Sequence, residues 1–471
     1  MCCLTLWACS KNPVTGKGQA FLMSEEKEIN IGKQNDPSIV ASFGLYEDAK
    51  IQSFINSKGQ QMAKISHRPN LPFEFKVLDS PVVNAFALPG GYVYFTRGIL
   101  AHFNNEAEFA GVLGHEIGHV TARHGAQQQR NQIAAQVGLI AGLVLNKNFA
   151  QFAQQAQQGM QLLLMKNSRD HESQSDELGV LYSTQIGYDS HEMADFFKTL
   201  KRLGEQNGAS IPTFMSTHPD PADRYNRVHE LSDKAEEQFG SASTRWKVNR
   251  EQYLRMIDGL VYGEDPKQGY VENNKFYHPE LKFEYPVPQG WRLQNSPQQV
   301  QMASEDGKGM MIFTLAQEES LEQAAAKLVQ DAQLQVKKQE KGNINSFQSL
   351  TMEATQTNPQ TGQSLQILST FIKNGDLIYV FHGLAAPEDF GRYRGAFMNT
   401  SRGYKRLTDQ SKINVKPERI KIITVEQSGT LANALGKAGI PTSRFEEFSI
   451  LNGMETTERV ERGAMIKVIQ K

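Results

Sequence analysis

The chain has 471 residues, which is enough for about three domains that each bury a core of their own. Its 50 Lys and Arg residues balance 51 Asp and Glu residues, so the net charge is −1, and no strongly basic stretch indicates nucleic acid as a partner. The three cysteines are Cys2, Cys3 and Cys9, so no disulfide or cysteine-ligated metal is expected in the folded body.

The N-terminus resembles the end of a bacterial lipoprotein signal, with Leu6 and Ala8 at positions that such signals favour before a lipidated cysteine. We therefore expect residues 1–9 to be a partial signal that ends at a lipidated Cys9 and attaches the chain to a membrane. Ser10 stands where an aspartate would favour inner-membrane retention, so an outer-membrane lipoprotein on the periplasmic side of a bacterial envelope is expected. The alternative is an accidental match.

A Pro-Gly-Gly turn leads into residues 91–96, a run of β-forming residues. At the edge of a sheet such a strand can pair with an extended peptide through backbone hydrogen bonds, which suits an enzyme that acts on unfolded segments. The alternative is an ordinary core strand. The substrate-binding residues predicted by the edge interpretation are Gly91, Tyr92, Val93 and Tyr94.

The next predicted element is a helix that carries the motif His115-Glu116-Ile117-Gly118-His119. Asn105 and Glu108 are typical of an N-cap with a capping box, and apolar residues follow at helical spacing. Both imidazoles then lie one turn apart on one helix face and can bind one zinc ion, while Glu116 is free to handle a proton of the attacking water. The motif therefore predicts a zinc peptidase.

Two segments that follow the motif are ambiguous. Residues 133–145 are apolar, but Gln136 interrupts them and they are shorter than the roughly 20 residues that a membrane-spanning helix needs. We expect a buried or groove-lining helix there. The Gln-rich residues 149–161 fit either a mobile lid or a helical hairpin that packs on the core.

A zinc peptidase needs a third protein ligand and keeps the fourth position open. The polar run 167–179 places Glu172 and Asp176 one helical turn apart on one face. Glu172 can be the third ligand, and Asp176 can accept the distal N–H of a ligating histidine. His171 and Glu177 compete for these roles.

The flanked motif around His115 and the run from Ser168 to Asp176 together resemble the HtpX-like and CAAX-prenyl-protease-like zinc metallopeptidases, metallopeptidase family forty-eight. Residues 84–98 resemble the strand that precedes the metal helix in this family, and residues 216–219 with Arg224 resemble its motif after the third ligand. The family usually has alanine at the position of Ser175. The resemblance implies one Zn²⁺ per chain, the general base Glu116, and the ligands His115, His119 and Glu172.

The resemblance also favours the edge-strand interpretation and implies an α+β fold with a mainly helical gluzincin peptidase domain and a small sheet. The tetrahedral intermediate of peptide hydrolysis needs a donor for its oxyanion, which His218 or Arg224 can supply. His218 can instead be a fourth ligand that keeps the enzyme latent. The remaining alternative is that residues 216–219 only form a turn before a helix.

Three domains follow from these patterns. Residues 20–265 are the predicted zinc metallopeptidase domain, and residues 275–405 are an α+β accessory domain in which residues 285–291 faintly resemble the PsbP/Mog-like fold. His278 and His382 have no carboxylate or histidine neighbours at ligand spacing and are expected to be structural.

Residues 415–471 resemble a LysM-type β-α-α-β module, which implies binding of an N-acetylglucosamine-containing glycan such as peptidoglycan. The usual aspartate between Gly429 and Thr430 is missing, and packing against the peptidase domain is the competing role.

The sequence therefore predicts a zinc-dependent endopeptidase that hydrolyses peptide bonds of unfolded or unassembled envelope proteins. The alternative is a chaperone-like or peptidoglycan-binding scaffold with a latent metal site. The enzyme is favoured because every residue that the chemistry needs is present.

Overall fold

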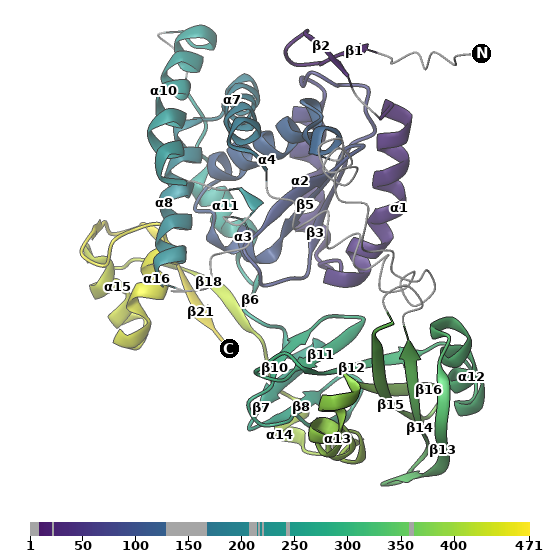
Figure 1. Cartoon of the computed structure of the whole chain (residues 1–471). Coiled ribbons are helices and arrows are strands. Elements are labelled where there is room, and N and C mark those ends of the chain that lie inside the picture. The colour runs from purple at the N-terminus through teal and green to yellow at the C-terminus, as the bar shows by residue number, and fades with distance from the viewer. Residues whose placement is uncertain are drawn as a thin grey trace, which may run out of the picture.

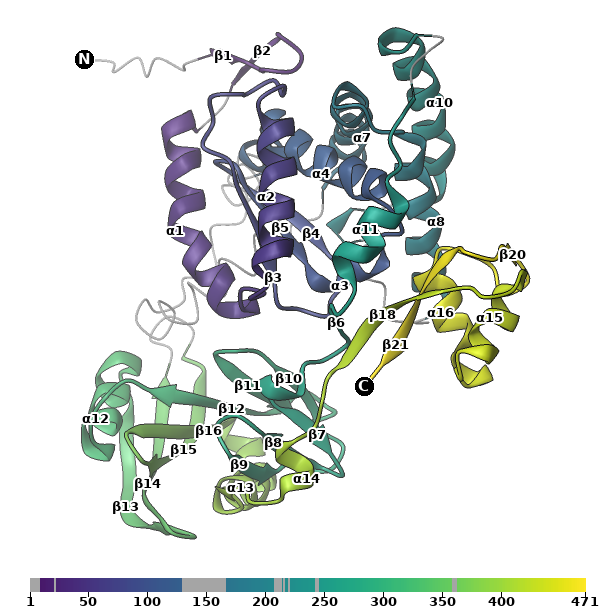
Figure 2. The same cartoon turned by 180° about the vertical axis from the view of Figure 1, so that it is seen from behind.

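The computed structural model describes residues 9–20, 23–128, 167–206, 214, 217–218, 221–241, 245–357 and 362–471. Figures 1 and 2 show a helical N-terminal part with a small sheet, a sheet-rich middle part in green, and a small C-terminal part in yellow that returns to the helical part. The α+β class is confirmed in this form. The helix expected over 133–145 and the lid or helical hairpin considered for 149–161 lie outside the described residues, as does the signal before Cys9.

In the N-terminal part, helices surround a three-stranded sheet. A single apolar core joins the sheet to the helices that follow it. In the described residues, no helix is both long and apolar enough to cross a membrane. The elements of this part are β1 (Cys9–Lys11), β2 (Gly18–Ala20), α1 (Glu25–Phe43), α2 (Ala49–Ala63), β3 (Glu74–Leu78), β4 (Ala85–Leu88), β5 (Tyr92–Thr96), α3 (Arg97–His102), α4 (Glu106–Thr121), α7 (Arg169–Gln185), α8 (His191–Gln206), α10 (Pro221–Phe239) and α11 (Arg250–Ile257).

The order of the small sheet corrects the predicted edge strand. β5 is the central strand, parallel to β3 and antiparallel to β4, and all five of its residues are buried. Tyr94 donates a hydrogen bond to Asp36 of α1, 2.8 Å away. The predicted edge strand is therefore not formed by Gly91, Tyr92, Val93 and Tyr94, because β5 has a neighbouring strand on each side. A continuous run of β-formers without alternating polar residues is typical of a strand that is covered on both faces.

Helix α4 begins at the predicted cap, Asn105, but the second bond of the predicted capping box is made to the residue before the cap. The side chain of Asn105 accepts a hydrogen bond from the backbone N–H of Glu108 at 2.8 Å, which satisfies one of the free donors at the helix start. The Glu108 carboxylate accepts from the backbone N–H of Asn104 at 2.7 Å, one residue before the cap. All sixteen residues of α4 are buried, so the helix runs through the centre of the N-terminal part.

The middle part holds a seven-stranded antiparallel sheet, a four-stranded sheet and two helices of twelve or more residues. Ser320 caps α12, and a turn at Asn374-Gly375 joins β15 to β16. The elements are β6 (Val261–Tyr262), η1 (Pro266–Gln268), β7 (Tyr270–Glu272), β8 (Lys275–His278), β9 (Phe283–Pro286), β10 (Arg292–Asn295), β11 (Gln299–Ala303), β12 (Gly309–Ala316), α12 (Leu321–Ala332), β13 (Gln335–Ile344), β14 (Phe347–Thr357), β15 (Ser364–Asn374), β16 (Leu377–Ala385), α13 (Pro387–Arg402), β17 (Lys405–Arg406) and α14 (Gln410–Ile413).

The C-terminal part has the strand–helix–helix–strand order that the sequence predicts. It packs against the N-terminal part, as both views show (Figures 1 and 2). Its apolar residues belong to the same core cluster as those of α4 and α11, and β18 pairs with both β21 and β6. The elements are β18 (Glu418–Thr424), β19 (Gly429–Thr430), α15 (Leu431–Lys437), η2 (Thr442–Arg444), α16 (Phe445–Leu451), β20 (Arg459–Val460) and β21 (Met465–Gln470).

A buried lysine ties the C-terminal part to the turn that precedes α4. The Lys467 side chain is 0% exposed, and its Nζ donates to the backbone carbonyls of Ala101 and Phe103, both at 2.9 Å. Burial lowers the pKa of Lys467 well below its ordinary value. These contacts favour packing against the N-terminal part, the role that competes with glycan binding for the C-terminal part.

Replacement of Lys467 by methionine is expected to lower the free energy of unfolding by about 1–3 kcal/mol, because the two carbonyls lose their donor inside the core. The control is Lys421→Met in β18, the strand that pairs with β21. This change removes a half-exposed ion pair with Asp258 and is expected to lower the free energy of unfolding by less than about 1 kcal/mol. Urea unfolding measures both. Equal losses in the two variants would contradict the role given to Lys467.

Candidate metal centre

Four side chains from three segments converge on one point. α4 supplies His115 and His119, whose Nε2 atoms are 3.0 Å apart. α7 supplies Glu172, whose carboxylate oxygens lie 3.5 Å from His115 Nε2 and 3.4 Å from His119 Nε2. The fourth is His218, whose Nδ1 is 3.0 Å from Glu172 Oε1. One donor atom from each of the four residues lies within 4.8 Å of all the others, and all four residues are buried.

Glycines allow α4 and α7 to approach closely enough for this convergence. A Cβ on Gly114 would lie 2.9 Å from the backbone oxygen of Gly179 in α7, and a Cβ on Gly118 would lie 3.0 Å from Leu178 Cβ. Both glycines are in the turns that carry the two histidines. The small residues of the motif region therefore bring Glu172 within reach of the imidazoles.

Asp176 lies where the sequence predicts it, behind His115. Its Oδ1 is 3.0 Å from His115 Nδ1, the nitrogen that faces away from the cluster. Burial alone would raise the pKa of the Asp176 carboxyl, but the nearby Arg224 guanidinium and the contact with His115 hold that pKa below its ordinary value. An ionised Asp176 accepts the Nδ1–H of His115 and leaves the Nε2 lone pair directed at the cluster.

Arg224 does not fit the predicted oxyanion-donor role. Its Nε and Nη2 donate to Asp176 at 2.8 and 2.5 Å, and its Nη1 lies 3.1 Å from Glu172. The guanidinium thus holds two carboxylates of α7 in place, and Arg224 is not among the residues that line the adjacent pocket. His218 is the other candidate donor for the oxyanion, and sequence spacing does not show that the arginine faces α7.

Glu116 is a buried carboxylate without a hydrogen-bond partner. It is 0% exposed, and within the described part of the chain neither of its oxygens accepts a hydrogen bond. Burial raises the pKa of the Glu116 carboxyl. His218 Nε2 lies 3.7 Å from Glu116 Oε1. A bare buried carboxylate is costly unless a bound group shares its space. With three imidazoles and a carboxylate beside it, this donor set fits Zn²⁺.

The competing ligand candidates lie outside the cluster. His171 Nε2 contacts Gln127 Oε1 at 3.2 Å, and Glu177 pairs with Arg227 at 2.5 Å. His218 joins the cluster, and its ring also stacks on Phe214 with 4.5 Å between ring centroids. Its flanking residues Ser216 and Pro219 lie outside the described residues.

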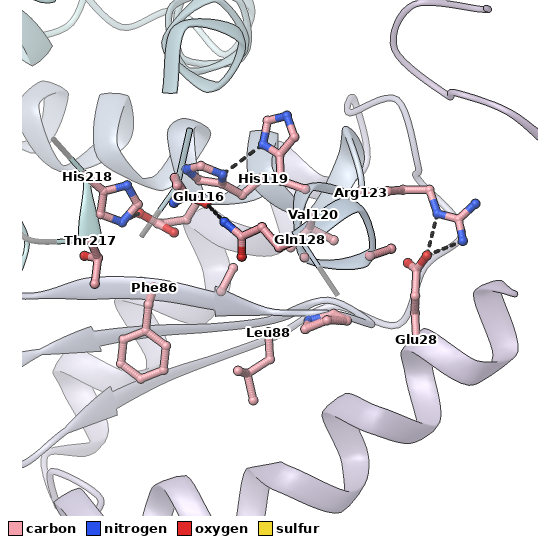
Figure 3. Close-up of a pocket in the computed structure, with 16 residues that line it drawn as sticks. Glu28, Phe86, Leu88, Glu116, His119, Val120, Arg123, Gln128, Thr217 and His218 are labelled. Atoms are coloured by element: carbon pink, nitrogen blue, oxygen red, sulfur yellow. Dashed lines mark hydrogen bonds and ion pairs between the residues drawn. The ribbon is translucent and has the colours of Figure 1, made fainter. Parts of the chain in front are cut away.

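A pocket opens between the metal helix and the small sheet. Figure 3 shows Glu116, His119 and His218 on one side and Phe86 and Leu88 of β4 on the other. β4, not β5, is therefore the strand next to the cluster, and it is an edge strand of its sheet. A separate strand β4 was not predicted, although residues 85–88 lie inside the segment that resembles the strand region before the family's metal-binding helix.

Comparisons with known proteins agree with this geometry. Residues 49–232 match the model of Peptidase family M48. The chain is 28% identical over 237 residues to the beta-barrel assembly-enhancing protease of Yersinia pestis, covering 46% of this chain and 47% of that protein. It is 32% identical over 175 residues to the mitochondrial metalloendopeptidase OMA1 of Arabidopsis thaliana, covering 37% of this chain and 35% of that protein. The chain thus spans about half or less of the length of these relatives, and the matches support a metalloprotease.

Among solved structures, cyanobacterial PsbP from Synechocystis sp. PCC 6803 matches 28% of this chain and 91% of its own, at 11% identity and a TM-score of 0.24. The yeast Ran-binding protein Mog1p matches at 13% identity and a TM-score of 0.23. These scores do not establish a shared fold, so the PsbP/Mog-like fold of the middle part stays a prediction.

Proposed function

We propose that this protein is a zinc-dependent endopeptidase that hydrolyses peptide bonds of unfolded or unassembled proteins in a bacterial envelope. The observation that carries the proposal is the convergence of His115, His119 and Glu172 on one point, with the unpaired buried carboxylate of Glu116 beside it. The family match and the named protease relatives support the reaction class.

The residues of the cluster have distinct roles in this proposal. His115, His119 and Glu172 would hold zinc, which when bound polarises the scissile carbonyl and acidifies the attacking water. Glu116 takes the proton of that water and later delivers it to the leaving amine. Asp176 and Arg224 keep the ligands oriented.

The edge strand β4 is the proposed binding site for the substrate backbone. β5 occupies one side of β4, and no described strand pairs with its other side. Ala87 and Leu88 of β4 line the same pocket as Glu116 and His119. A peptide added to this edge would be held through backbone hydrogen bonds, which needs an extended segment but little side-chain specificity. The arrangement therefore suits unfolded substrates.

The envelope location is proposed from the N-terminus and the relatives. Cys9 lies in β1, and its proposed lipidation would place the chain on a membrane, with the outer membrane as the expected site. The Yersinia pestis relative is named for β-barrel assembly, and we extend protein quality control in the envelope to this chain. The LysM likeness and peptidoglycan binding of residues 415–471 stay predictions, which the packing of Lys467 does not favour.

Digestion of casein, which lacks a stable fold, beside a stably folded protein tests the substrate class. We expect fragments from casein and none from the folded protein. If the zinc-loaded chain releases fragments from neither, the scaffold with a latent metal site becomes the better description.

His218 is proposed as a fourth ligand that restrains the resting enzyme. Its Nδ1 lies 3.3 Å from His115 Nε2 and 3.0 Å from Glu172, so it points at the same place as the other donors. Replacement by alanine is expected to raise casein digestion and to change the absorption spectrum of the cobalt-substituted protein, since one nitrogen donor is lost.

The alternatives for His218 give other results. An oxyanion donor predicts a kcat lower by about 10²-fold or more with an unchanged cobalt spectrum. If both activity and the cobalt spectrum are unchanged, only the third interpretation remains, in which residues 216–219 form a turn before a helix.

A further inference from the structure

His124 and His171 lie on the side of His119 that faces away from the cluster. His119 Nδ1 is 2.9 Å from His124 Nδ1, and His124 Nε2 is 2.9 Å from Gln174 Oε1. His124 follows α4, and Gln174 belongs to α7, the helix that also supplies Glu172. His124 is 1% exposed, so this contact is shielded from solvent.

The proton positions in this series of contacts follow from the groups at its two ends, His119 and Gln174. His119 directs Nε2 at the other donor atoms, so a neutral His119 that uses the Nε2 lone pair for a ligand carries its proton on Nδ1. His124 Nδ1 must then be unprotonated to accept that hydrogen bond. The proton of a neutral His124 is therefore on Nε2, where it is donated to the amide oxygen of Gln174. Each contact has one donor and one acceptor.

Further contacts fix the ring of His124. It stacks on His171 with 4.2 Å between ring centroids and 14° between the planes. Ser175 Oγ lies 3.3 Å from His124 Nδ1 and competes, at the longer distance, with His119 Nδ1–H for the one lone pair of that nitrogen. Ser175 is the residue at which this chain differs from the alanine that is usual in the family it resembles. The serine thus has a partner in the same cluster.

We propose that His124 is a positioning residue for the metal centre, which accepts the Nδ1–H of His119 and is itself held by Gln174. This inference rests on the proposed zinc site. It gives each metal-facing histidine of α4 its own acceptor: Asp176 is an anionic one for His115, and His124 is a neutral one for His119. The neutral acceptor orients His119 without adding a further negative charge to a site that already holds Glu172 and Asp176.

The test is the zinc affinity of the full chain, measured by competition with a chromophoric chelator and without any substrate. His124→Phe keeps an aromatic ring next to His171 but removes the acceptor, and zinc affinity is expected to fall by about 10–100-fold. His124→Gln offers an amide oxygen to His119 Nδ1–H and is expected to recover part of that loss. The cobalt-substituted His124→Phe protein should also show a changed absorption spectrum.

His102→Phe is the matched control. His102 is a buried histidine of the same part of the chain, 6% exposed, and its Nδ1 contacts the Gly98 carbonyl oxygen at 2.7 Å. Both phenylalanine variants are expected to lose stability in urea unfolding with chelator present, but only His124→Phe should lose zinc affinity.

Unchanged zinc affinity in His124→Phe, beside a wild type that binds zinc tightly, would overturn the role of His124 and leave the proposed function intact. An equal loss in His102→Phe would overturn it as well, because the effect would then be a general one of core disruption. A wild type that binds no zinc would overturn both the inference and the proposed function.

Discussion

Replacement of Glu116 by glutamine is expected to abolish proteolysis while zinc binding is retained. The amide has nearly the same shape as the carboxylate but cannot take a proton, and loss of a general base costs about 10²–10⁴-fold or more in rate. Glu116 is not among the four residues whose donor atoms converge, so the metal affinity should not fall. The measurement is casein digestion together with zinc content per chain.

The stability of the metal-free Glu116→Gln protein gives a second readout. Neither oxygen of Glu116 has a hydrogen-bond partner in the described residues, so a neutral amide removes a buried charge that no hydrogen bond stabilises. The metal-free variant should therefore unfold at the same or a higher urea concentration than the wild type. Glu177→Gln, at an exposed ion pair with Arg227, is the control and should leave proteolysis unchanged. Near-normal turnover in zinc-loaded Glu116→Gln would refute the mechanism.

Replacement of Glu172 by alanine is expected to weaken zinc binding by orders of magnitude and to remove proteolysis with it. The change deletes the anionic member of the cluster and leaves His218 Nδ1 and Arg224 Nη1 without their carboxylate. Zinc content after dialysis against a mild chelator is the measurement. Asp170→Ala, at an exposed acidic residue in the first turn of the same helix, is the control and should retain zinc.

A Glu172→Ala protein that keeps close to one zinc ion per chain after this dialysis would contradict the assignment of the third ligand. His171 and Glu177, which compete with Glu172 in the sequence, contact Gln127 and Arg227 instead. His218 would then be the remaining candidate, since it is the only other described residue of the cluster.

The sequence predicted the parts of the site that depend on helix geometry. Spacing within one helix fixes the relation of His115 to His119 and that of Glu172 to Asp176, because both pairs are one turn apart. The choice of Glu172 over His171 came from the family resemblance, and the structure brings Glu172 to the histidines. Spacing could not show that α4 and α7 approach through glycines, which depends on contacts between distant segments.

The errors have a related physical origin. Residues 91–96 have the composition of a strand, but composition does not tell which strands pair on each side, and β5 is central. Arg224 was one of two candidate donors for the oxyanion, beside His218, and its partners Asp176 and Glu172 are visible only in the folded chain. Lys467 has the appearance of a surface residue, yet β21 directs it at two backbone carbonyls inside the core.

The most direct test of the zinc centre is stepwise return of zinc to the metal-free wild-type chain while casein digestion is recorded. We expect no digestion without metal and a rate that rises in proportion to added zinc until one equivalent per chain is bound, because His115, His119 and Glu172 converge on one ion. Full digestion by the metal-free chain, or no digestion after one equivalent has bound, would contradict this expectation.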